Sequence, residues 1–575
     1  MFSQTVGATC LGTAYVTANQ VPNLLYELIL GGALTSAMVP VLARSAERAA
    51  HDPAEKARVG TITSALLTWT VVITVPLTLL IVATAGPIAS LLNPSNPHAQ
   101  CVHADVVAVT GDMLRVFAPQ ALLYGLSVVL YGLLQSYRRF VAPSIGPGIS
   151  SLVLISCYLA FVPLNKGLPL AQLPLSAQLV LSVGTTLGIA ALVVVALPPT
   201  RRLHLRLRPV LRFPPGVARR AGGLALVGVI ELIVIDLSGL VSIALANGHG
   251  ETGAIVLFNY ASQVFGTISA VLALSVVVSA FPVLSARKGP DFDRTSAGST
   301  RAVLLLSWLG TAVVAAIAVP AAHVLAKQPD QVSQLTWAFV LFAPAIAGAS
   351  VIANLSRVML IIGRLKVATA ALAGSWAIVI VADVVLVQLV PAWLVPAMLA
   401  LGTTIGQIVV AIPLVFVTRR ICGPAAVQGA GHANLAGLVA CAAGVVVGVA
   451  VSLAVPLHHK LVAAALAVPA AGCAIIAFGV VAYLLDDGDL KAVLAWVRRA
   501  MGRLRSLRCP TRKARCMARP GCRVHRLPRL ACSRSIASNS ALKLPLPKPC
   551  DPCRSISSKN TVGRSCTGWV KICSR

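Results

Sequence analysis

Residues 61–86 read TITSALLTWTVVITVPLTLLIVATAG and contain no Asp, Glu, Lys or Arg. An apolar helix of about 20 residues is long enough to cross the hydrocarbon core of a bilayer. Lipid offers no hydrogen-bond partner to the peptide backbone, so a run of this kind has to satisfy its own N–H and C=O groups as a helix. The stretch therefore predicts a transmembrane helix, and the uncharged sequence around it extends over 59–103.

Similar runs fill most of the 575-residue chain, of which 57% is hydrophobic and 11% charged. This composition is typical of a membrane protein with many spans and excludes a soluble domain as the main unit. We predict an all-α polytopic membrane protein. Its thirteen spans are expected near 16–42, 61–86, 113–136, 143–163, 175–197, 221–246, 252–284, 302–325, 333–360, 367–390, 394–416, 433–456 and 461–484.

The charges of the loops predict the orientation of these spans. Arg and Lys gather in every second loop, whereas the loops between carry few of them. The rule that basic loops stay inside places the first set in the cytoplasm. We therefore expect a plasma-membrane protein with a cytoplasmic C-terminus and with Met1 outside. The basic loops lie near 44–58, 138–139, 201–220, 287–294, 364–366 and 419–420.

The spans also predict the domain organisation. A chain that starts outside without a leading apolar segment is awkward to insert, so we expect a further helix upstream, fourteen in all. The predicted parts are an extracytoplasmic N-terminal remnant (1–15), an N-lobe (16–200), a basic cytoplasmic loop (201–220), a C-lobe (221–416), a cytoplasmic loop (417–432), two additional helices (433–484) and a tail (485–575).

Short signatures recur in the same order in the two lobes. Phe117-Ala118-Pro119 returns as Phe342-Ala343-Pro344, and Val39-Pro40-Val41-Leu42 returns as Phe281-Pro282-Val283-Leu284. The partners are offset by six spans, an even number, so the repeats are parallel. Parallel repeats predict two pseudo-symmetric bundles related by an axis along the membrane normal, with a substrate cleft between them.

The tail differs in composition from the rest of the chain. Residues 501–575 contain 18 of the 47 Lys and Arg residues and eight of the 14 Cys residues. We expect this part to be disordered and cytoplasmic. A basic tail on anionic lipid, an RNA-binding arm with Trp569 as its aromatic platform and translation in a wrong frame are the alternatives. The abrupt change favours the last, and we predict no nucleic-acid partner.

Motifs of soluble catalytic sites are missing from the sequence. There is no GxxxxGK[ST] and no HExxH, the ten His residues are dispersed, and the six Cys residues before residue 500 make no cluster with ligand spacing. We predict a transporter with no catalytic residue, metal site or bound cofactor. Its energy would come from the membrane potential or from an ion gradient.

The segment 21–25 reads VPNLL and is followed by Glu27, by the small residues 31–33 and by the apolar segment 39–42. Residues 114–115 (LR), 132–143 (GLLQSYRRFVAP) and 259–261 (NYA) add to this pattern. Together they resemble the MurJ (MviN-type) lipid II flippases of the MOP exporter superfamily, and more closely their actinobacterial branch. The resemblance covers roughly residues 5–485.

The resemblance implies two six-helix lobes with two extra helices. It implies that the chain carries lipid II, the undecaprenyl-pyrophosphate-linked peptidoglycan precursor, across the plasma membrane by alternating access. The head group would cross a cationic cavity, and the lipid tail would lie in a groove beside 433–484. Lipid II, membrane lipids and cell-wall synthesis proteins are the implied partners.

The sequence departs from this family where the cavity is expected. Positions that usually hold an arginine read Tyr26 and Glu27, and an Asp-Arg pair reads Ser262-Gln263. Glu27 lines the cavity or lies at the outer interface. An arginine facing the cavity would pair bidentately with pyrophosphate, whereas one near a span end would snorkel. The substrate-cavity candidates are Tyr26, Glu27, Arg115, Ser262, Gln263 and Arg357.

Two aspartates are candidates for an ion site. Asp236 and Asp383 lie on the helices that hold a sodium ion in some members of the resembled family. Either Na⁺ or H⁺ would be the coupling ion, although Val379, one turn before Asp383, offers no oxygen ligand. The alternative is a buried aspartate that is neutral or hydrogen-bonded to a Ser or Thr of a neighbouring helix.

Two other functions fit the same architecture. One is the export of another polyprenyl-linked glycan or of a drug, and the other is a non-transporting scaffold for cell-wall synthesis. A cationic cleft would favour the lipid pyrophosphate, whereas an acidic, aromatic cleft would favour drug export.

Overall fold

A computed structural model describes residues 1–26, 47–49, 52–165, 170–211, 217–455 and 459–485 of the chain. Every regular element in these ranges is helical, which confirms the all-α prediction. Twelve of the described helical segments are long and apolar enough to cross a membrane. The first predicted span, 16–42, begins within a helix and runs on into residues outside the described part.

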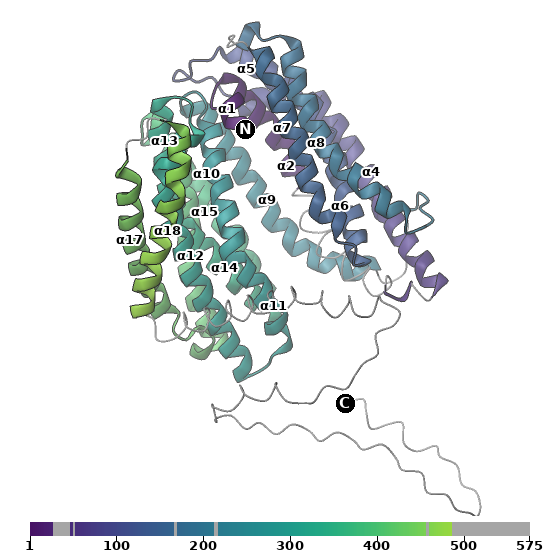
Figure 1. Cartoon of the computed structure of the whole chain (residues 1–575). Coiled ribbons are helices and arrows are strands. Elements are labelled where there is room, and N and C mark those ends of the chain that lie inside the picture. The colour runs from purple at the N-terminus through teal and green to yellow at the C-terminus, as the bar shows by residue number, and fades with distance from the viewer. Residues whose placement is uncertain (27–46, 50–51, 166–169, 212–216, 456–458, 486–575) are drawn as a thin grey trace, which may run out of the picture. The chain divides into compact units, whose positions relative to one another are not determined.

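In the N-lobe, here residues 1–211, the described elements are a short helix, six long helices and one 3₁₀ turn, which Figure 1 shows side by side. The helices α7 and α8 pack along each other, and α2 packs against α5. The elements are α1 (Phe2–Thr5), α2 (Cys10–Tyr26), α4 (Pro53–Leu92), α5 (His103–Phe117), α6 (Gln120–Ser136), α7 (Val141–Asn165), η2 (Leu170–Gln172) and α8 (Leu175–Arg201).

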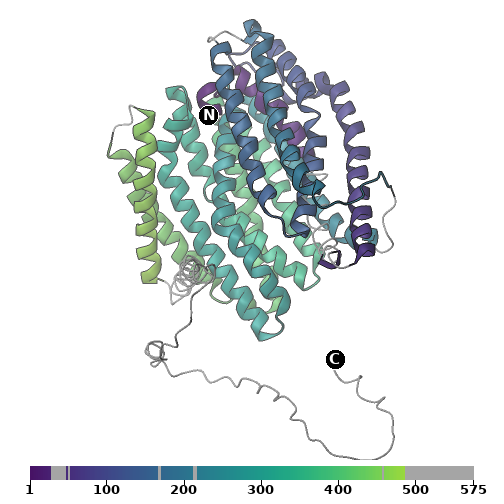
Figure 2. The ribbon, with the colours of Figure 1, turned by 45° about the vertical axis from the view of Figure 1, so that its right-hand side comes forward.

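In the C-lobe, here residues 217–422, α15 packs against both α9 and α16. Its elements are α9 (Val217–His249), α10 (Ala254–Ser269), the π-turn η3 (Ala270–Leu274), α11 (Ser275–Ala286), α12 (Pro290–Leu325), α13 (Pro329–Phe342), α14 (Ala345–Ile361), α15 (Leu365–Gln388), η4 (Ala392–Leu394) and α16 (Val395–Cys422). After η5 (Pro424–Val427), the helices α17 (Ala430–Leu453) and α18 (Lys460–Leu485) pack on α12 at the edge of the bundle (Figure 2).

The repeated Phe-Ala-Pro signature occupies the same place in both lobes. It separates α5 from α6 and α13 from α14, and in each case the proline caps the second helix. Proline has no N–H to give to the preceding turn, so it interrupts the helix and then starts the next one. Each pair of short helices therefore forms one interrupted span.

Several helices begin well before the apolar run that predicted them. α4 starts at Pro53 instead of near 61, because Asp52 accepts a hydrogen bond from Ala54 N at 2.8 Å and Pro53 fills the first helical position. α12 also starts with a proline, Pro290, although the residue before it, Gly289, offers no side-chain cap. These polar first turns extend the helix without extending the hydrophobic run.

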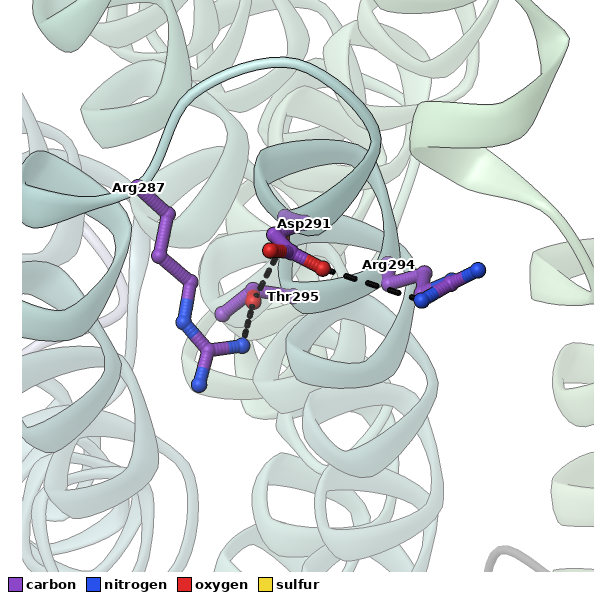
Figure 3. Close-up of polar contacts among 4 residues, drawn as sticks. All are labelled: Arg287, Asp291, Arg294 and Thr295. Carbon is purple, nitrogen blue, oxygen red and sulfur yellow. Dashed lines mark hydrogen bonds and ion pairs between the residues drawn. The ribbon is translucent and has the colours of Figure 1, made fainter. Parts of the chain in front are cut away.

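The turn between α11 and α12 is held by polar contacts (Figure 3). Arg287 donates to Thr295 Oγ1 at 2.6 Å, and the same hydroxyl donates to the carbonyl of Asp291 at 2.7 Å. Arg294 lies 3.6 Å from the Asp291 carboxylate. Arg287 lies three residues after the second copy of the Pro-Val-Leu signature. The arginine that follows this copy therefore fixes the turn between α11 and α12.

We name the two ends of the helices after residues that lie there. The Cys10 end carries α1 and the loops 93–102, 250–253, 326–328 and 389–391, and the Arg287 end carries the loops 137–140, 202–211, 287–289, 362–364 and 423–429. The basic loops of the described part all belong to the Arg287 end, as the alternation of loop charge predicted.

Among the residues that the structure describes, the two lobes share a hydrophobic core at the Cys10 end. One cluster there joins residues of both lobes, among them Tyr15, Phe117, Ile255 and Phe339. The other described clusters each stay on one side, since one lies wholly in the N-lobe around Leu133 and two lie in the C-lobe and the segments that follow it. The described residues thus pack the lobes together at the Cys10 end.

Candidate functional site between the two lobes

A cavity of about 160 Å³ lies between α2 of the N-lobe and five helices of the C-lobe. Four aromatic rings and several hydroxyl or amide groups line it, and no charged side chain is among the described lining residues. The polar residues are Gln20, Ser238, Ser242, Asn259, Ser262 and Thr403, and the aromatic ones are Phe258, Phe265, Phe342 and Trp376. The site is therefore neutral and amphipathic in the described part.

The predicted substrate-cavity residues of this region are only partly brought together. Ser262 on α10 lines the cavity, whereas its neighbour Gln263 is exposed and absent from the lining. Tyr26 is the last residue of α2, and its side chain lies outside the described part, as does the whole of Glu27. Ser262 is thus the one of these candidates that the structure places at the cavity, while the roles of all four remain predictions.

Asp383 on α15 is fully buried beside the cavity, with 0% of its surface exposed. Its Oδ2 accepts a hydrogen bond of 2.9 Å from Ser242 on α9. Ser242 also lines the cavity, so one hydroxyl group joins the buried carboxyl to the space between the lobes. The pairing matches the alternative in which a serine of a neighbouring helix binds a buried aspartate.

Two glycines of α16 make room for Asp383. A methyl group at Gly402 would overlap the Asp383 carboxylate, and one at Gly406 would overlap Val379 and the backbone at Ser375. Small residues spaced by four allow two helices to approach closely within a membrane. α15 and α16 therefore lie close enough that the carboxyl is shielded from lipid by backbone.

The second predicted ion-site residue, Asp236, is also buried and lies on α9, six residues before Ser242. Val379 is buried and apolar one turn before Asp383. Among the described residues, no three His, Cys, Asp or Glu side chains are grouped so that they could hold a metal ion. The two aspartates thus stay candidates, with Asp383 the better defined of them.

Neither arginine candidate lines the cavity. Arg115 on α5 forms an ion pair with Asp112 one turn earlier, at 2.5 Å, and its side chain is 49% exposed. Arg357 on α14 is half-buried, and the charge that acts on it is that of Glu231 on α9. Both arginines thus have an acidic neighbour, and their contact with a substrate remains a prediction.

An apolar groove of about 530 Å³ lies between α12 and α18. All its lining side chains are hydrocarbon or aromatic, apart from the hydroxyl group of Tyr483. The lining residues are Ala302, Leu305, Leu306, Leu309, Ile475, Ile476, Phe478, Gly479, Val480, Tyr483 and Leu484. It lies beside the second of the two additional helices, in the region where the family resemblance implied a groove for a lipid tail.

Hydrogen bonds close the space between the lobes at the Cys10 end. Asn96 Nδ2 donates to the carbonyls of Asn247 at 2.8 Å and Gly250 at 2.7 Å. Asn247 Nδ2 donates to Thr17 Oγ1 at 2.9 Å and to Leu92 O at 2.9 Å. No side-chain hydrogen bond or ion pair between the lobes is found toward the Arg287 end of the part that the structure describes.

Residues 1–8 add further contacts at the same end. Lys327 Nζ donates to Thr5 O at 2.7 Å and to Val6 O at 3.2 Å, and Gln331 Nε2 donates to Ala8 O at 2.9 Å. Phe2 contacts the rings of Tyr15 and Tyr260, which belong to different lobes. The segment predicted as a remnant before the first span is therefore part of the packed interface.

A disulfide joins Cys10, at the start of α2, to Cys101, at the end of the loop before α5. This bond was not predicted from the sequence, because 91 residues separate the two positions and no spacing rule pairs them. One signal was available, since the predicted orientation placed both cysteines outside the cytoplasm, where disulfides persist. The other described cysteines, at 157, 422, 441 and 473, are free.

Comparison with known proteins connects this geometry to a family. The family model described as lipid II flippase MurJ matches residues 2–468. The chain is 26% identical over 332 residues to the lipid II flippase MurJ of Burkholderia cenocepacia, which is 56% of this chain and 59% of that protein. It is 30% identical over 185 residues to a probable lipid II flippase MurJ of Synechocystis sp., 32% of each chain. The matches thus span less than two thirds of these relatives.

Solved structures share the fold. One is a lipid II flippase MurJ in an inward closed conformation, with a TM-score of 0.61 and 14% identity, covering 82% of this chain and 93% of the other. Another is a multidrug resistance MATE family transporter of the MOP superfamily in an inward-facing conformation, with a TM-score of 0.58 and 13% identity, covering 74% and 93%. Since the family model matches most of the sequence, the chain belongs to the family of the lipid II flippase MurJ.

Proposed function

We propose that this protein carries lipid II across the plasma membrane by alternating access between its two lobes. Family membership supports the substrate. The observation that supports the mechanism is the packing of the described residues, which form a shared core and hydrogen bonds at the Cys10 end and separate cores toward the Arg287 end. An arrangement closed on one side is one of the two states that alternating access requires.

The cavity is small for the head group of this substrate. Its volume of about 160 Å³ is below the roughly 300–1,000 Å³ of sites that bind drug-sized ligands. A disaccharide with a pentapeptide is larger than such ligands, so the lobes would have to move apart before it enters. The end without described hydrogen bonds between the lobes would open for loading.

We assign the Cys10 end to the extracytoplasmic side and the C-terminus to the cytoplasm. The basic loops support this orientation, because they belong to the opposite end. The disulfide between Cys10 and Cys101 supports it independently, since disulfides persist in oxidising compartments. The state described here is then closed toward the outside.

The groove beside α18 would hold the polyprenyl tail. Its volume of about 530 Å³ and its apolar lining suit an isoprenoid chain. Such a groove would let the tail stay in the lipid phase while the head group passes between the lobes. The two additional helices would then act as a guide for the tail.

Asp383 and Ser242 are the proposed point at which an ion gradient acts on transport. A buried carboxyl inside a membrane costs free energy unless it is neutral or paired, so such residues mark sites of proton or ion movement. The Ser242 hydroxyl connects this carboxyl to the cavity. Val379, which lies one turn before Asp383 on the same helix, is apolar and offers no oxygen ligand for Na⁺. H⁺ therefore suits the site better than Na⁺.

A second candidate function is the export of a different amphipathic substrate, by the same movement. The observation that favours it is the neutral, aromatic lining of the cavity, which lacks the positive charge expected for a pyrophosphate. Aromatic rings with scattered hydroxyl groups bind apolar and neutral ligands in general. The non-transporting scaffold has no comparable observation in its favour.

Complementation separates these functions. The chain is expressed in bacteria whose own lipid II flippase is depleted, and growth and cell shape are followed. Rescue by the wild-type chain and loss of rescue by Asp383→Leu support transport of the peptidoglycan precursor. Extrusion of a neutral amphipathic dye without rescue would support export of a different substrate instead. Binding of cell-wall synthases without rescue would support a scaffold instead.

A further inference from the structure

The loop that precedes α5 is tied to both lobes, but by bonds of different kinds. Its link to the N-lobe is covalent, through the disulfide from Cys101 to Cys10 on α2. Its links to the C-lobe include hydrogen bonds from Asn96 to two carbonyl groups and from the backbone N–H of Gln100 to Thr252 Oγ1 at 2.9 Å. We call residues 93–102 together with 250–253 the gate.

We propose that the Cys10–Cys101 disulfide is a redox-sensitive clamp that fixes the gate loop on the N-lobe. When the gate opens, the loop then stays with α2, and the lobes part between residues 93–102 and 250–253. This inference rests on the proposed alternating access.

The position of the disulfide explains how it acts on the hydrogen bonds. Cys101 Sγ lies 3.8 Å from Thr252 Oγ1, and the backbone N–H of the neighbouring Gln100 donates a hydrogen bond to the same hydroxyl group. Residues 93–102 form no helix, so the loop is held by these local contacts and by the disulfide. A covalent tie restricts the conformations of a loop and so favours the contacts that it makes from its fixed position.

The gate loop has an internal structure that suits this role. Asn96 Oδ1 accepts from the His98 amide at 2.9 Å, and the ring of His103 is hydrogen-bonded to Asn93 O at 2.8 Å. These bonds shape the loop but do not fix it to α2. The disulfide is the covalent connection that does so, and both of its cysteines pack on the shared core at the edge of the interface.

Reduction would release the clamp. Two electrons and two protons convert the disulfide to two thiols, and a dithiol donor is oxidised to its own disulfide in the exchange. In the test the donor is dithiothreitol. In the cell, formation of the bond would pass the two electrons to an extracytoplasmic dithiol–disulfide oxidoreductase. The reduced loop keeps its hydrogen-bonding groups but samples more conformations, so the closed gate becomes less populated.

The first measurement asks whether the bond is present. Free thiols of the full-length protein are blocked with N-ethylmaleimide without reductant, and the peptides are identified by mass spectrometry. The expected result is one linked peptide pair containing Cys10 and Cys101, with Cys157 and Cys473 alkylated. Alkylation of Cys10 and Cys101 in the native protein would overturn the inference and would leave the proposed transport untouched.

The second measurement asks whether the bond controls the gate. Hydrogen exchange of the backbone N–H of Gln100 reports its hydrogen bond to Thr252 Oγ1 directly, because this N–H is the donor. Addition of dithiothreitol to the folded protein, or the substitution Cys101→Ser, is expected to raise its exchange rate at least tenfold. Cys473→Ser, which removes a free cysteine of α18, is the matched control and is expected to change nothing.

If the bond is present but its removal leaves the Gln100 exchange rate unchanged, the clamp is refuted. Dithiothreitol provides the result even if Cys101→Ser fails to fold, because the bond is then broken after folding. Transport by the untreated protein is measured separately, so failure of the clamp and failure of the proposed function give different outcomes.

Discussion

Ser242 on α9 donates a hydrogen bond of 2.9 Å to Oδ2 of Asp383 on α15. The hydroxyl group is at the same time part of the cavity between the lobes, whereas the carboxyl is fully buried. A change in the occupancy of the cavity or in the protonation of Asp383 therefore acts on the same hydrogen bond. It also acts on the packing of α9 against α15, two helices that are far apart in sequence.

Asp383→Asn keeps the size of the side chain and removes its ability to exchange a proton. We expect this variant to fold and to lose the dependence of transport on a pH gradient. Ser242→Ala removes the one hydrogen bond described for the carboxyl and should destabilise the fold by about 1–3 kcal/mol. Uptake assays at several imposed gradients and thermal unfolding test both. Gradient-dependent transport by Asp383→Asn would refute the proposed coupling site.

Gly402→Ala should disturb the same site from the other side. The added methyl group overlaps the Asp383 carboxylate, and overpacking of a core typically costs about 1–3 kcal/mol. Gly374→Ala is the control on α15, because nothing lies within 4 Å of its added Cβ. The unfolding midpoint in detergent should fall for Gly402→Ala alone. Equal midpoints for the two variants would show that α16 does not confine Asp383.

Gly253→Ala should open the gate. Gly253 has φ = +85° and its added Cβ would overlap Ala8, whereas Gly363 has φ = +78° and open space around it. Both substitutions carry the cost of a left-handed backbone, about 1–2 kcal/mol, but only the first pushes the lobes apart.

The readout is the labelling of a buried position below the gate. In an Ala14→Cys background, a membrane-impermeant maleimide should react at residue 14 at least tenfold faster with Gly253→Ala than with Gly363→Ala. Ala14 has 0% exposure, so its reaction requires an opening. Equal rates would contradict the position of the gate.

Lys460 affects the ionisation of Lys327. Burial, and then the charge of Lys460, lower the pKa of Lys327 below its usual value of 10.5. Between the lowered pKa of the folded protein and 10.5, Lys327 binds more protons in the unfolded chain than in the folded protein. The contribution of Lys327 to the free energy of unfolding is therefore complete above pH 10.5 and is lost as the pH falls through the lowered pKa. Removing the positive charge of Lys460 reverses part of the lowering of the Lys327 pKa.

Lys460→Gln should therefore raise the pKa of Lys327. The pH at which an amine-reactive reagent acylates Lys327 at half its maximal rate is the measurement, and it should shift upward. Lys366→Gln, an exposed lysine of the Arg287 end, should leave it unchanged. A downward shift with Lys460→Gln would mean that the two ammonium groups do not repel each other.

The fold was largely predictable from sequence because a membrane helix leaves a local signal, a long uncharged apolar run. The uncharged run 61–86 lies within α4, and each Phe-Ala-Pro signature lies at a helix break. Helix starts were less predictable, since polar first turns such as the one capped by Asp52 leave no hydrophobic signal. The span expected at 16–42 is described only as far as Tyr26.

The site was less predictable because it depends on the register between distant helices. The sequence marked Asp383 as a costly buried group and allowed a serine or threonine partner, but it could not name Ser242, which is 141 residues away. It offered Arg115 and Arg357 for the substrate and could not place Asp112 and Glu231 beside them. The cavity aromatics Phe258 and Trp376 had no local signal that separates them from core residues.

The most direct test is transfer of lipid II in proteoliposomes that contain the purified full-length chain. A fluorescent lipid II is placed in both leaflets, and a membrane-impermeant quencher reports how fast the inner pool becomes accessible. We predict transfer at least tenfold faster than in protein-free vesicles, with further acceleration by a pH gradient. Transfer at the protein-free rate, with folded protein in the membrane, would contradict the account.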